Sequence, residues 1–175
     1  MRTLVILAHP HFEQSRLNSR VVKELQGKEE VTIHNLYEAY PNEQLDVARE
    51  QALVEAHDRI VFQFPFYWYS SPPLLKKWID EVIVYGWAYG SPEAVALRGK
   101  ELLISITTGS VKENYTSEGR NKFTIDELLR PYEATSNLIG MTLLPHNVLY
   151  GASVITDEEL EEAVKPYSAK ITSKK

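Results

Sequence analysis

Short apolar segments alternate along this chain with longer segments in which apolar residues recur every three or four positions. Most of the short segments lack a polar face, which is typical of strands buried on both sides in a parallel sheet. Proline or glycine bounds several of them. Five strands are therefore predicted, at 4–8, 31–36, 59–65, 101–109 and, less regularly, 141–151.

The longer segments have the apolar spacing of amphipathic helices. In the first of them Leu17 and Val21 are four positions apart, and Ser15 stands at a suitable N-cap position. Pro131 is expected to kink the fourth helix, and Asp157 is expected to cap the last. The five predicted helices cover 16–25, 45–56, 74–83, 125–139 and the segment that begins at 157.

Strands that alternate with helices predict an α/β fold, a three-layer sandwich with a five-stranded parallel sheet between helices. The 175 residues fit a single domain, 1–175, without linkers or internal repeats. Ligands of such sheets lie beyond the carboxyl ends of the strands. If the strand order is 2-1-3-4-5, the loops after the first, third and fourth strands converge there and form the candidate site.

The composition is that of an ordinary globular domain, with 43% apolar and 25% charged residues. The chain has no cysteine, so disulfides and thiolate chemistry are excluded and any redox work needs a bound cofactor. A net charge of −5 without a basic block argues against a nucleic-acid partner. No membrane-spanning run or signal-peptide pattern is present, so no membrane insertion and a cytoplasmic location are expected.

The loop after the first strand, HPHFEQSRLN (9–18), combines a helix N-terminus with several hydrogen-bond donors. Backbone N–H groups and the helix dipole favour an anion at such a place. A phosphate site is therefore indicated, with donors or charge from His9, His11, Ser15, Arg16 and Asn18. The alternative is that Ser15 only caps the helix and that the two histidines are solvated loop residues. No metal site is expected, because the histidines of this loop have no carboxylate cluster near them.

The loop after the third strand has four consecutive aromatic residues between prolines: Phe66, Tyr67, Trp68 and Tyr69. Aromatic clusters usually belong to a core. This cluster instead follows a strand end and is stiffened by Pro65 and two later prolines. A stiff aromatic platform suits a planar ring, since a stacked pair contributes about 0.5–1.5 kcal/mol beyond area burial. The backbone N–H groups of this loop are expected to be free for heteroatoms of that ring.

The loop after the fourth strand begins with Thr107, Thr108 and Gly109. Their donors would stabilise negative charge on a reduced ring. Tyr115 follows, and its phenol could donate a hydrogen bond to the same ring, although a surface tyrosine is the alternative. A phosphate site, an aromatic platform and an anion-stabilising loop together predict flavin mononucleotide (FMN), which would supply the hydride chemistry itself.

Four segments carry a resemblance to a known family: LAHPHFEQSRLN, FPFYWYSSPPLLKKWIDEV, YGWAYG and ITTGSVKENYTSEG. They resemble the NAD(P)H:quinone oxidoreductase family of flavodoxin-like flavoproteins. The short bacterial members are most similar; these include general-stress reductases and ancillary reductases of glutathione-gated potassium efflux channels. The resemblance implies a flavodoxin-like fold, NAD(P)H as co-substrate, and ping-pong two-electron reduction of quinones or similar acceptors. FMN is expected, with FAD as the alternative, because longer members hold the adenosine half with a C-terminal extension.

The resemblance also implies which residues hold the flavin. It matches Ser15, Leu17 and Asn18 to contacts with the phosphate and the ribityl chain, and His9 belongs to the same loop. It matches residues 65–69 to the cradle of the isoalloxazine ring. Residues 107–109 match the loop at the pyrimidine edge of the ring.

Tyr115 matches the phenol that assists hydride transfer in animal quinone reductases. Those enzymes have a histidine six residues later, where this chain has Asn121, so the proton relay is incomplete here. The family forms homodimers whose active sites use both subunits. Tyr85, Trp87 and Tyr89 match the segment that lines the pocket of the neighbouring subunit, and ordinary packing is the alternative.

Some functional questions stay open at this level. The candidates for binding the 2′-phosphate of NADPH are Arg120 and Lys122, by charge alone. An electron-carrying flavodoxin would have the same fold, but the aromatic segment at 85–89 favours a closed small-molecule pocket. A regulatory subunit that contacts the cytosolic part of a potassium efflux channel is the second alternative.

Overall fold

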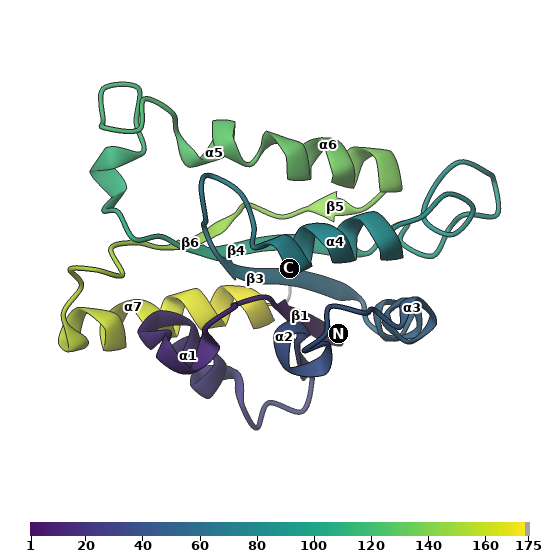
Figure 1. Ribbon diagram of the computed structural model, residues 1–175, viewed down its shortest axis with the longest axis horizontal. Helices are drawn as coiled ribbons and strands as arrows, with labels where there is room; N and C mark the ends of the chain where they lie inside the picture. Colours follow the sequence, from purple (N-terminus) through teal and green to yellow (C-terminus); the bar gives the residue numbers. More distant parts are fainter. Residues whose placement is uncertain (174–175) are drawn as a thin grey trace.

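The computed structural model describes residues 1–173 and consists of a parallel sheet between two helical layers (Figure 1). Every strand pairing is parallel, and the order is β2-β1-β3-β4-β5, with β6 also paired to β4. The predicted α/β fold and strand order are therefore confirmed. The strands are β1 (Thr3–Leu7), β2 (Val31–Asn35), β3 (Arg59–Pro65), β4 (Glu101–Thr107), β5 (Thr142–Leu143) and β6 (Asn147–Leu149).

The helices cover the two faces of the sheet. Figure 1 shows α4, α5 and α6 above the sheet and α1 and α7 below it. No helix within residues 1–173 is long and apolar enough to cross a bilayer. The helices are α1 (Arg16–Leu25), α2 (Leu36–Ala39), α3 (Val47–Glu55), α4 (Pro73–Val82), α5 (Ile125–Leu128), α6 (Arg130–Ile139) and α7 (Asp157–Thr172), with short 3-10 helices η1 (Phe12–Gln14) and η2 (Lys112–Asn114).

Alternate side chains of the central strands build two separate cores. Leu4 and Phe62 point to one face, where α2, α3, α4 and α6 pack. Val5 and Val61 point to the other face, where α1 and α7 pack. Because both faces are covered, these strands are mostly apolar and lack a polar face, as the sequence pattern predicted.

Two predicted elements are divided in the structure. The helix expected over 125–139 is two helices, interrupted at Leu129, where φ is −91° and ψ is 2°. Pro131 lies in the first turn of α6, where its missing N–H has no intrahelical partner to lose, so it starts a helix and kinks none. The fifth strand is divided by residues 144–146, which contain Pro145, a residue without an N–H for the ladder.

The caps of α1 and α7 follow the rules for helix N-termini. Ser15 caps α1 as predicted, and its Oγ accepts a hydrogen bond of 3.2 Å from the Asn18 N–H. The prediction for α7 was wrong by one residue, because Thr156 is the cap and Asp157 is the first helical residue. Thr156 and Glu159 form a reciprocal capping box, which satisfies two backbone donors where a lone aspartate would satisfy one.

Candidate functional site

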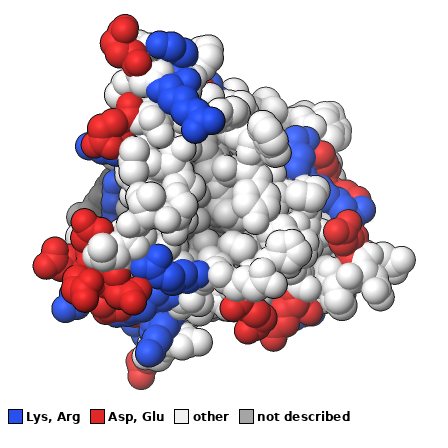
Figure 2. All heavy atoms as spheres, turned by 60° about the vertical axis from the view of Figure 1, so that its left-hand side comes forward, with Lys and Arg blue, Asp and Glu red and all other residues white. Residues whose placement is uncertain are grey.

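The loops after β1, β3 and β4 come together at the carboxyl ends of the strands, around two adjoining hollows. Figure 2 shows this side of the molecule, with an uncharged, hollowed centre and charged side chains toward its margins. We call the hollow beside α1 the cradle hollow; its volume is about 370 Å³. The outer hollow has a volume of about 510 Å³. Phe66 and Gly109 line both, so the two hollows are neighbours that share a wall.

Most of the predicted cofactor residues line the cradle hollow. They are His9, Ser15, Leu17, Asn18, Pro65, Phe66, Tyr67, Thr107, Thr108 and Gly109. Trp68, Tyr69 and Tyr115 line the outer hollow. Neither hollow is lined by an aspartate or a glutamate of the described residues. The structure therefore brings residues from three separate loops around one acid-free space.

The N-terminus of α1 presents hydrogen-bond donors to the cradle hollow. The Ser15 Oγ accepts from both the backbone N–H (3.2 Å) and the side-chain Nδ2 (3.0 Å) of Asn18. Its own proton is therefore available to a ligand. The N–H groups of Arg16 and Leu17, in the first turn, have no intrahelical acceptor. Hydroxyl and amide donors at the positive end of a helix are the donor set that binds phosphate.

Arg16 lines this hollow, but its guanidinium is directed to α7. It pairs with Asp157 at 2.9 Å and donates to the Ile155 carbonyl at 2.6 Å. The expectation that Arg16 would supply charge to the anion site is therefore not met, because the last helix competes for the same side chain.

His9 is held as a neutral ring at the edge of the cradle hollow. Its Nδ1 accepts a hydrogen bond of 3.1 Å from the backbone N–H of His11, which leaves the ring proton on Nε2. Burial, and secondarily the charge of His11, lower the pKa of His9. The ring packs edge-on against Tyr67, with centroids 6.3 Å apart. His9 therefore offers one neutral N–H donor.

A buried polar network, which the sequence analysis missed, supports the cradle from below. The Asn18 Nδ2 donates to the Thr107 Oγ1 (3.0 Å), and the Gln63 Nε2 donates to the Asn18 Oδ1 (2.7 Å). The Tyr167 hydroxyl donates to the Gln63 Oε1 (2.9 Å) and accepts from the Ser105 Oγ (2.8 Å). A glutamine inside an otherwise apolar strand was the available signal, since a buried amide needs partners.

The aromatic loop after β3 keeps three of its four rings out of the core, whereas Phe66 is partly buried and packs against it. Trp68 is 93% exposed, and Tyr67 and Tyr69 are partly exposed. Trp68 and Tyr69 have positive φ angles of 47° and 61°, a left-handed conformation that costs about 1–3 kcal/mol for residues of this kind. The alternative of a plain core cluster is therefore excluded for Trp68. Exposed aromatic rings on a strained backbone are typical of a ligand platform.

Of the four backbone N–H groups expected to be free in this loop, two are free within the described part of the chain and two are hydrogen-bonded. The Phe66 N–H donates to the Thr107 carbonyl (2.8 Å), and the Tyr67 N–H donates to the Pro65 carbonyl (2.9 Å). The N–H groups of Trp68 and Tyr69 have no acceptor within residues 1–173. The Phe66 donor is used because the loop starts by extending the pairing of β3 with β4, and the Tyr67 donor is used in a local turn that begins at Pro65.

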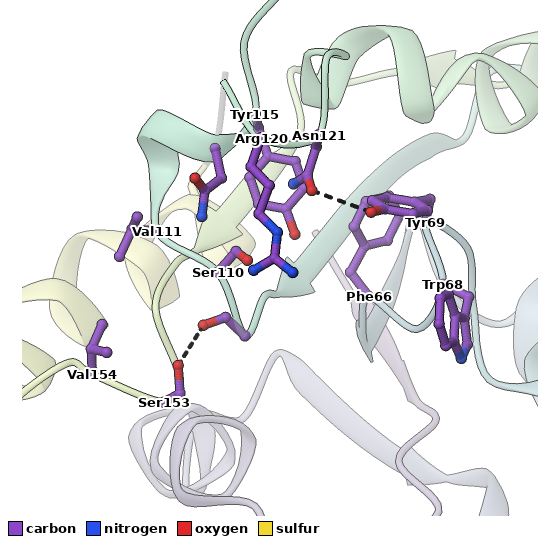
Figure 3. A pocket seen from close by; sticks show the side chains of 12 residues that line it. Phe66, Trp68, Tyr69, Ser110, Val111, Tyr115, Arg120, Asn121, Ser153 and Val154 are labelled. Carbon is purple, nitrogen blue, oxygen red and sulfur yellow. Dashed lines mark hydrogen bonds between the residues drawn. The ribbon is translucent and has the colours of Figure 1, made fainter. Parts of the chain in front are cut away.

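Tyr115 and Asn121 form one wall of the outer hollow, opposite Tyr69 (Figure 3). The Tyr69 hydroxyl donates to the Asn121 Oδ1 at 3.2 Å. Burial raises the pKa of Tyr115, and the nearby Thr108 hydroxyl offsets part of that increase. Tyr115 is therefore a protonated phenol at neutral pH, able to donate a hydrogen bond into the hollow.

Tyr85, Trp87 and Tyr89 do not reach either hollow of their own chain. Their loop follows α4 at the other end of the sheet (Figure 1). The Trp87 Nε1 donates to Glu55 at 2.7 Å, and the rings of Tyr85 and Tyr89 pack edge to face with centroids 5.9 Å apart. Tyr85 is 70% exposed.

The parallel sheet of order β2-β1-β3-β4-β5, with helices on both faces and the hollows at the carboxyl ends of its strands, defines a protein of the doubly wound α/β class. The chain belongs to the family described as having a flavodoxin-like fold, whose model matches residues 1–171.

Several named proteins are similar over nearly the whole chain. General stress protein 14 of Bacillus subtilis (strain 168) is 52% identical, over 94% of each chain. The uncharacterized NAD(P)H oxidoreductase YdeQ of the same organism is 46% identical, over 99% of this chain and 87% of its own. The glutathione-regulated potassium-efflux system ancillary protein KefF of Klebsiella pneumoniae (strain 342) is 37% identical, over 96% of this chain and 93% of its own.

Solved structures agree with this relationship. An NADPH-quinone reductase from P. pentosaceus has a TM-score of 0.92 at 34% identity and covers 100% of both chains. General stress protein 14 of Treponema denticola, in complex with FMN, has a TM-score of 0.90 at 37% identity, over 98% of both. A structure described as a thermophilic tryptophan halogenase from Streptomycin violaceusniger has a TM-score of 0.95 at 48% identity, and the match covers 98% of this chain and 99% of that one.

Proposed function

We propose that this protein is a flavin-dependent oxidoreductase that binds FMN in the cradle hollow and reduces quinones or similar acceptors with NAD(P)H. The observation that carries the proposal is the strained, exposed aromatic loop beside an acid-free phosphate-type site. The names of two similar proteins, an NAD(P)H oxidoreductase and an NADPH-quinone reductase, support the reaction. The FMN complex of a 37% identical protein supports the cofactor.

The residues of the cradle hollow fit FMN. Ser15 and Leu17 would hold the phosphate and the start of the ribityl chain with hydroxyl and backbone amide donors, and no carboxylate would repel it. Asn18, whose own donors bond Ser15 and Thr107, would line this place and orient the Ser15 hydroxyl toward the ligand. Residues 65–69 would hold the ring, and 107–109 would contact its pyrimidine edge. When bound, FMN would accept a hydride from NAD(P)H and pass two electrons to the acceptor.

The outer hollow would hold the nicotinamide and the acceptor in turn. Tyr69 and Tyr115 give it aromatic walls, and the protonated phenol of Tyr115 would donate a hydrogen bond to the acceptor oxygen. Because one planar ligand would occupy this place at a time, NAD(P)⁺ would leave before the quinone enters, which is a ping-pong scheme. Asn121 can orient Tyr69 but cannot exchange protons, so the solvent would supply the remaining proton.

We infer that the functional unit is a homodimer, as the family resemblance implies. Tyr85, Trp87 and Tyr89 lie in the loop after α4, at the other end of the sheet from the hollows (Figure 1), and Tyr85 is largely exposed. In a dimer with twofold symmetry they would complete the outer hollow of the partner and exclude water from it.

The similarity to KefF favours a second role, binding to the cytosolic part of a potassium efflux channel. This role would add to the oxidoreductase activity and would not replace it. Co-purification with the cytosolic domain of such a channel from the same genome, with and without FMN, tests it. One similar structure is described as a halogenase, and it supports the fold alone. The names of the other two relatives that state a reaction both describe oxidation of NAD(P)H or NADPH.

The test of the proposed function is direct. The purified protein should show the visible spectrum of a flavin, should release FMN on denaturation, and should oxidise NADH or NADPH when menadione is added. Replacing Trp68 by Ala should weaken FMN binding about tenfold, because a stacked ring and its buried area are lost. Phe123→Ala is the matched control, since Phe123 is 53% exposed and lines neither hollow. A protein that stays colourless with added FMN and FAD would refute the proposal.

A further inference from the structure

Arg120 is the one charged side chain among the described residues that line the outer hollow. Figure 3 shows its guanidinium reaching down into the hollow, beside Ser110 and below Tyr115. The remaining lining is aromatic, aliphatic or neutral polar. A single positive charge therefore stands at a wall where planar rings would bind.

No carboxylate within residues 1–173 lies at ion-pairing distance from Arg120. Arg16, which lines the cradle hollow, is by contrast already paired with Asp157. Lys122 lines neither hollow, and its Nζ lies 3.5 Å from the Glu118 carbonyl of its own loop. Of the two cations that the sequence suggested, only Arg120 therefore faces the site.

Close packing and hydrogen bonds fix the backbone on both sides of Arg120. Gly119 lies so close to the preceding turn that a Cβ there would collide with the Glu113 carbonyl oxygen, so no other residue fits without a shift. On the other side, the Asn121 N–H donates to the Asn114 carbonyl (3.0 Å), and its side chain accepts from Tyr69. Because the backbone is fixed in this way, less conformational entropy is lost when a ligand binds to the guanidinium.

Asn121 helps to position Arg120 but offers the hollow no further donor. Its Oδ1 accepts from the Tyr69 hydroxyl, and its Nδ2 is buried away from solvent and has no acceptor within the described part of the chain. A ligand in the outer hollow would therefore meet the guanidinium of Arg120 as its source of positive charge.

We propose that Arg120 forms an anion subsite in the outer hollow, and that the acceptors of this protein are planar aromatics bearing a carboxylate or sulfonate. This inference rests on the proposed function. In the step, a quinone gains a hydride and one solvent proton to become a hydroquinone, NAD(P)H becomes NAD(P)⁺, and the anionic substituent is unchanged. A guanidinium fork matches such a group bidentately. The 2′-phosphate of NADPH has the same charge, and the test separates the two sources.

The experiment compares Arg120→Gln with Lys112→Gln, which removes a positive charge from the same loop outside both hollows. The measured quantity is the ratio of kcat/KM for 1,4-naphthoquinone-2-sulfonate to kcat/KM for 1,4-naphthoquinone. Arg120→Gln should lower this ratio about tenfold, since a hydrogen bond to a charged group makes a substantial contribution even after solvent screening. Lys112→Gln should leave it unchanged.

An unchanged ratio in Arg120→Gln would overturn the proposal. A rise in KM for NADPH but not NADH, with the acceptor ratio unaltered, would also overturn it and assign the subsite to the 2′-phosphate. Binding of the redox-inert 2-naphthalenesulfonate to the FMN-loaded protein, measured by calorimetry, should weaken about tenfold in Arg120→Gln alone. This measurement needs no turnover, so a failure of the proposed reaction remains distinguishable from a failure of the subsite.

Discussion

Replacing Glu50 by Gln should destabilise the protein without touching the candidate site. Glu50 lies on α3 and is 0% exposed. Its Oε1 accepts hydrogen bonds from the His34 Nε2 (2.9 Å) and the Tyr40 hydroxyl (2.5 Å), and its Oε2 accepts from the Trp78 Nε1 (2.7 Å). One carboxylate thus ties α3 to β2, α2 and α4.

The magnitude follows from the donors that surround the carboxylate. Trp78 can only donate, so the oxygen of the substituted amide must face it, and the amide N–H₂ then meets His34 and Tyr40. Two charge-assisted hydrogen bonds are lost or reversed, each worth about 1.5–3 kcal/mol, and rotation of the Tyr40 hydroxyl recovers part of the loss. We expect the free energy of unfolding to fall by about 2–3 kcal/mol and Tm to fall by about 4–12 °C.

The pH dependence gives a second, independent check. Burial raises the pKa of Glu50, but the hydrogen bonds from His34, Tyr40 and Trp78 outweigh it, so the pKa is below its usual 4.5 in the folded state. A carboxyl with a lowered folded pKa adds stability above its unfolded pKa and loses it as the pH falls through the folded value. The difference between wild type and Glu50→Gln should therefore be constant near pH 7 and should shrink below about pH 4.5.

Urea unfolding followed by circular dichroism between about pH 3.5 and 8 measures this difference. Glu38→Gln is the control, because Glu38 is exposed and lies on the neighbouring α2. Equal stabilities of wild type and Glu50→Gln at pH 7, or a difference that grows with acidity, would refute the reasoning.

Three further variants test the candidate site. Tyr167→Phe leaves the Gln63 Oε1 without its donor, so fluorescence titration should show FMN binding about threefold to tenfold more weakly. Unchanged affinity would mean that the buried polar network does not support FMN binding in the cradle hollow. Tyr115→Phe should lower kcat for menadione about tenfold while FMN affinity stays constant; an unchanged kcat would exclude a role for the phenol. Ser15→Ala should weaken FMN binding more than riboflavin binding, because only FMN carries the phosphate; equal losses would mean that Ser15 serves only as a helix cap.

The fold was predictable because its signals are local. Apolar runs without a polar face indicated strands buried on both sides, and the alternation with helices implied right-handed crossovers and a parallel sheet. Ser15 was recognisable as a cap from its neighbours in the sequence. The predictions that failed were at boundaries: the break at Leu129 and the cap at Thr156 depend on how each end is packed and hydrogen-bonded.

The class of fold, the three loops at the carboxyl ends of the strands, and the aromatic and hydroxyl residues of those loops could be recognised from the sequence. Three-dimensional packing was needed to learn that Arg120 faces the outer hollow, that Arg16 pairs with Asp157 of α7, and that Gln63 supports the cradle. The reason is separation along the chain. The bonds of the cradle join residues 45, 89 and 104 positions apart, whereas the patterns that predict helices and strands arise from residues a few positions apart.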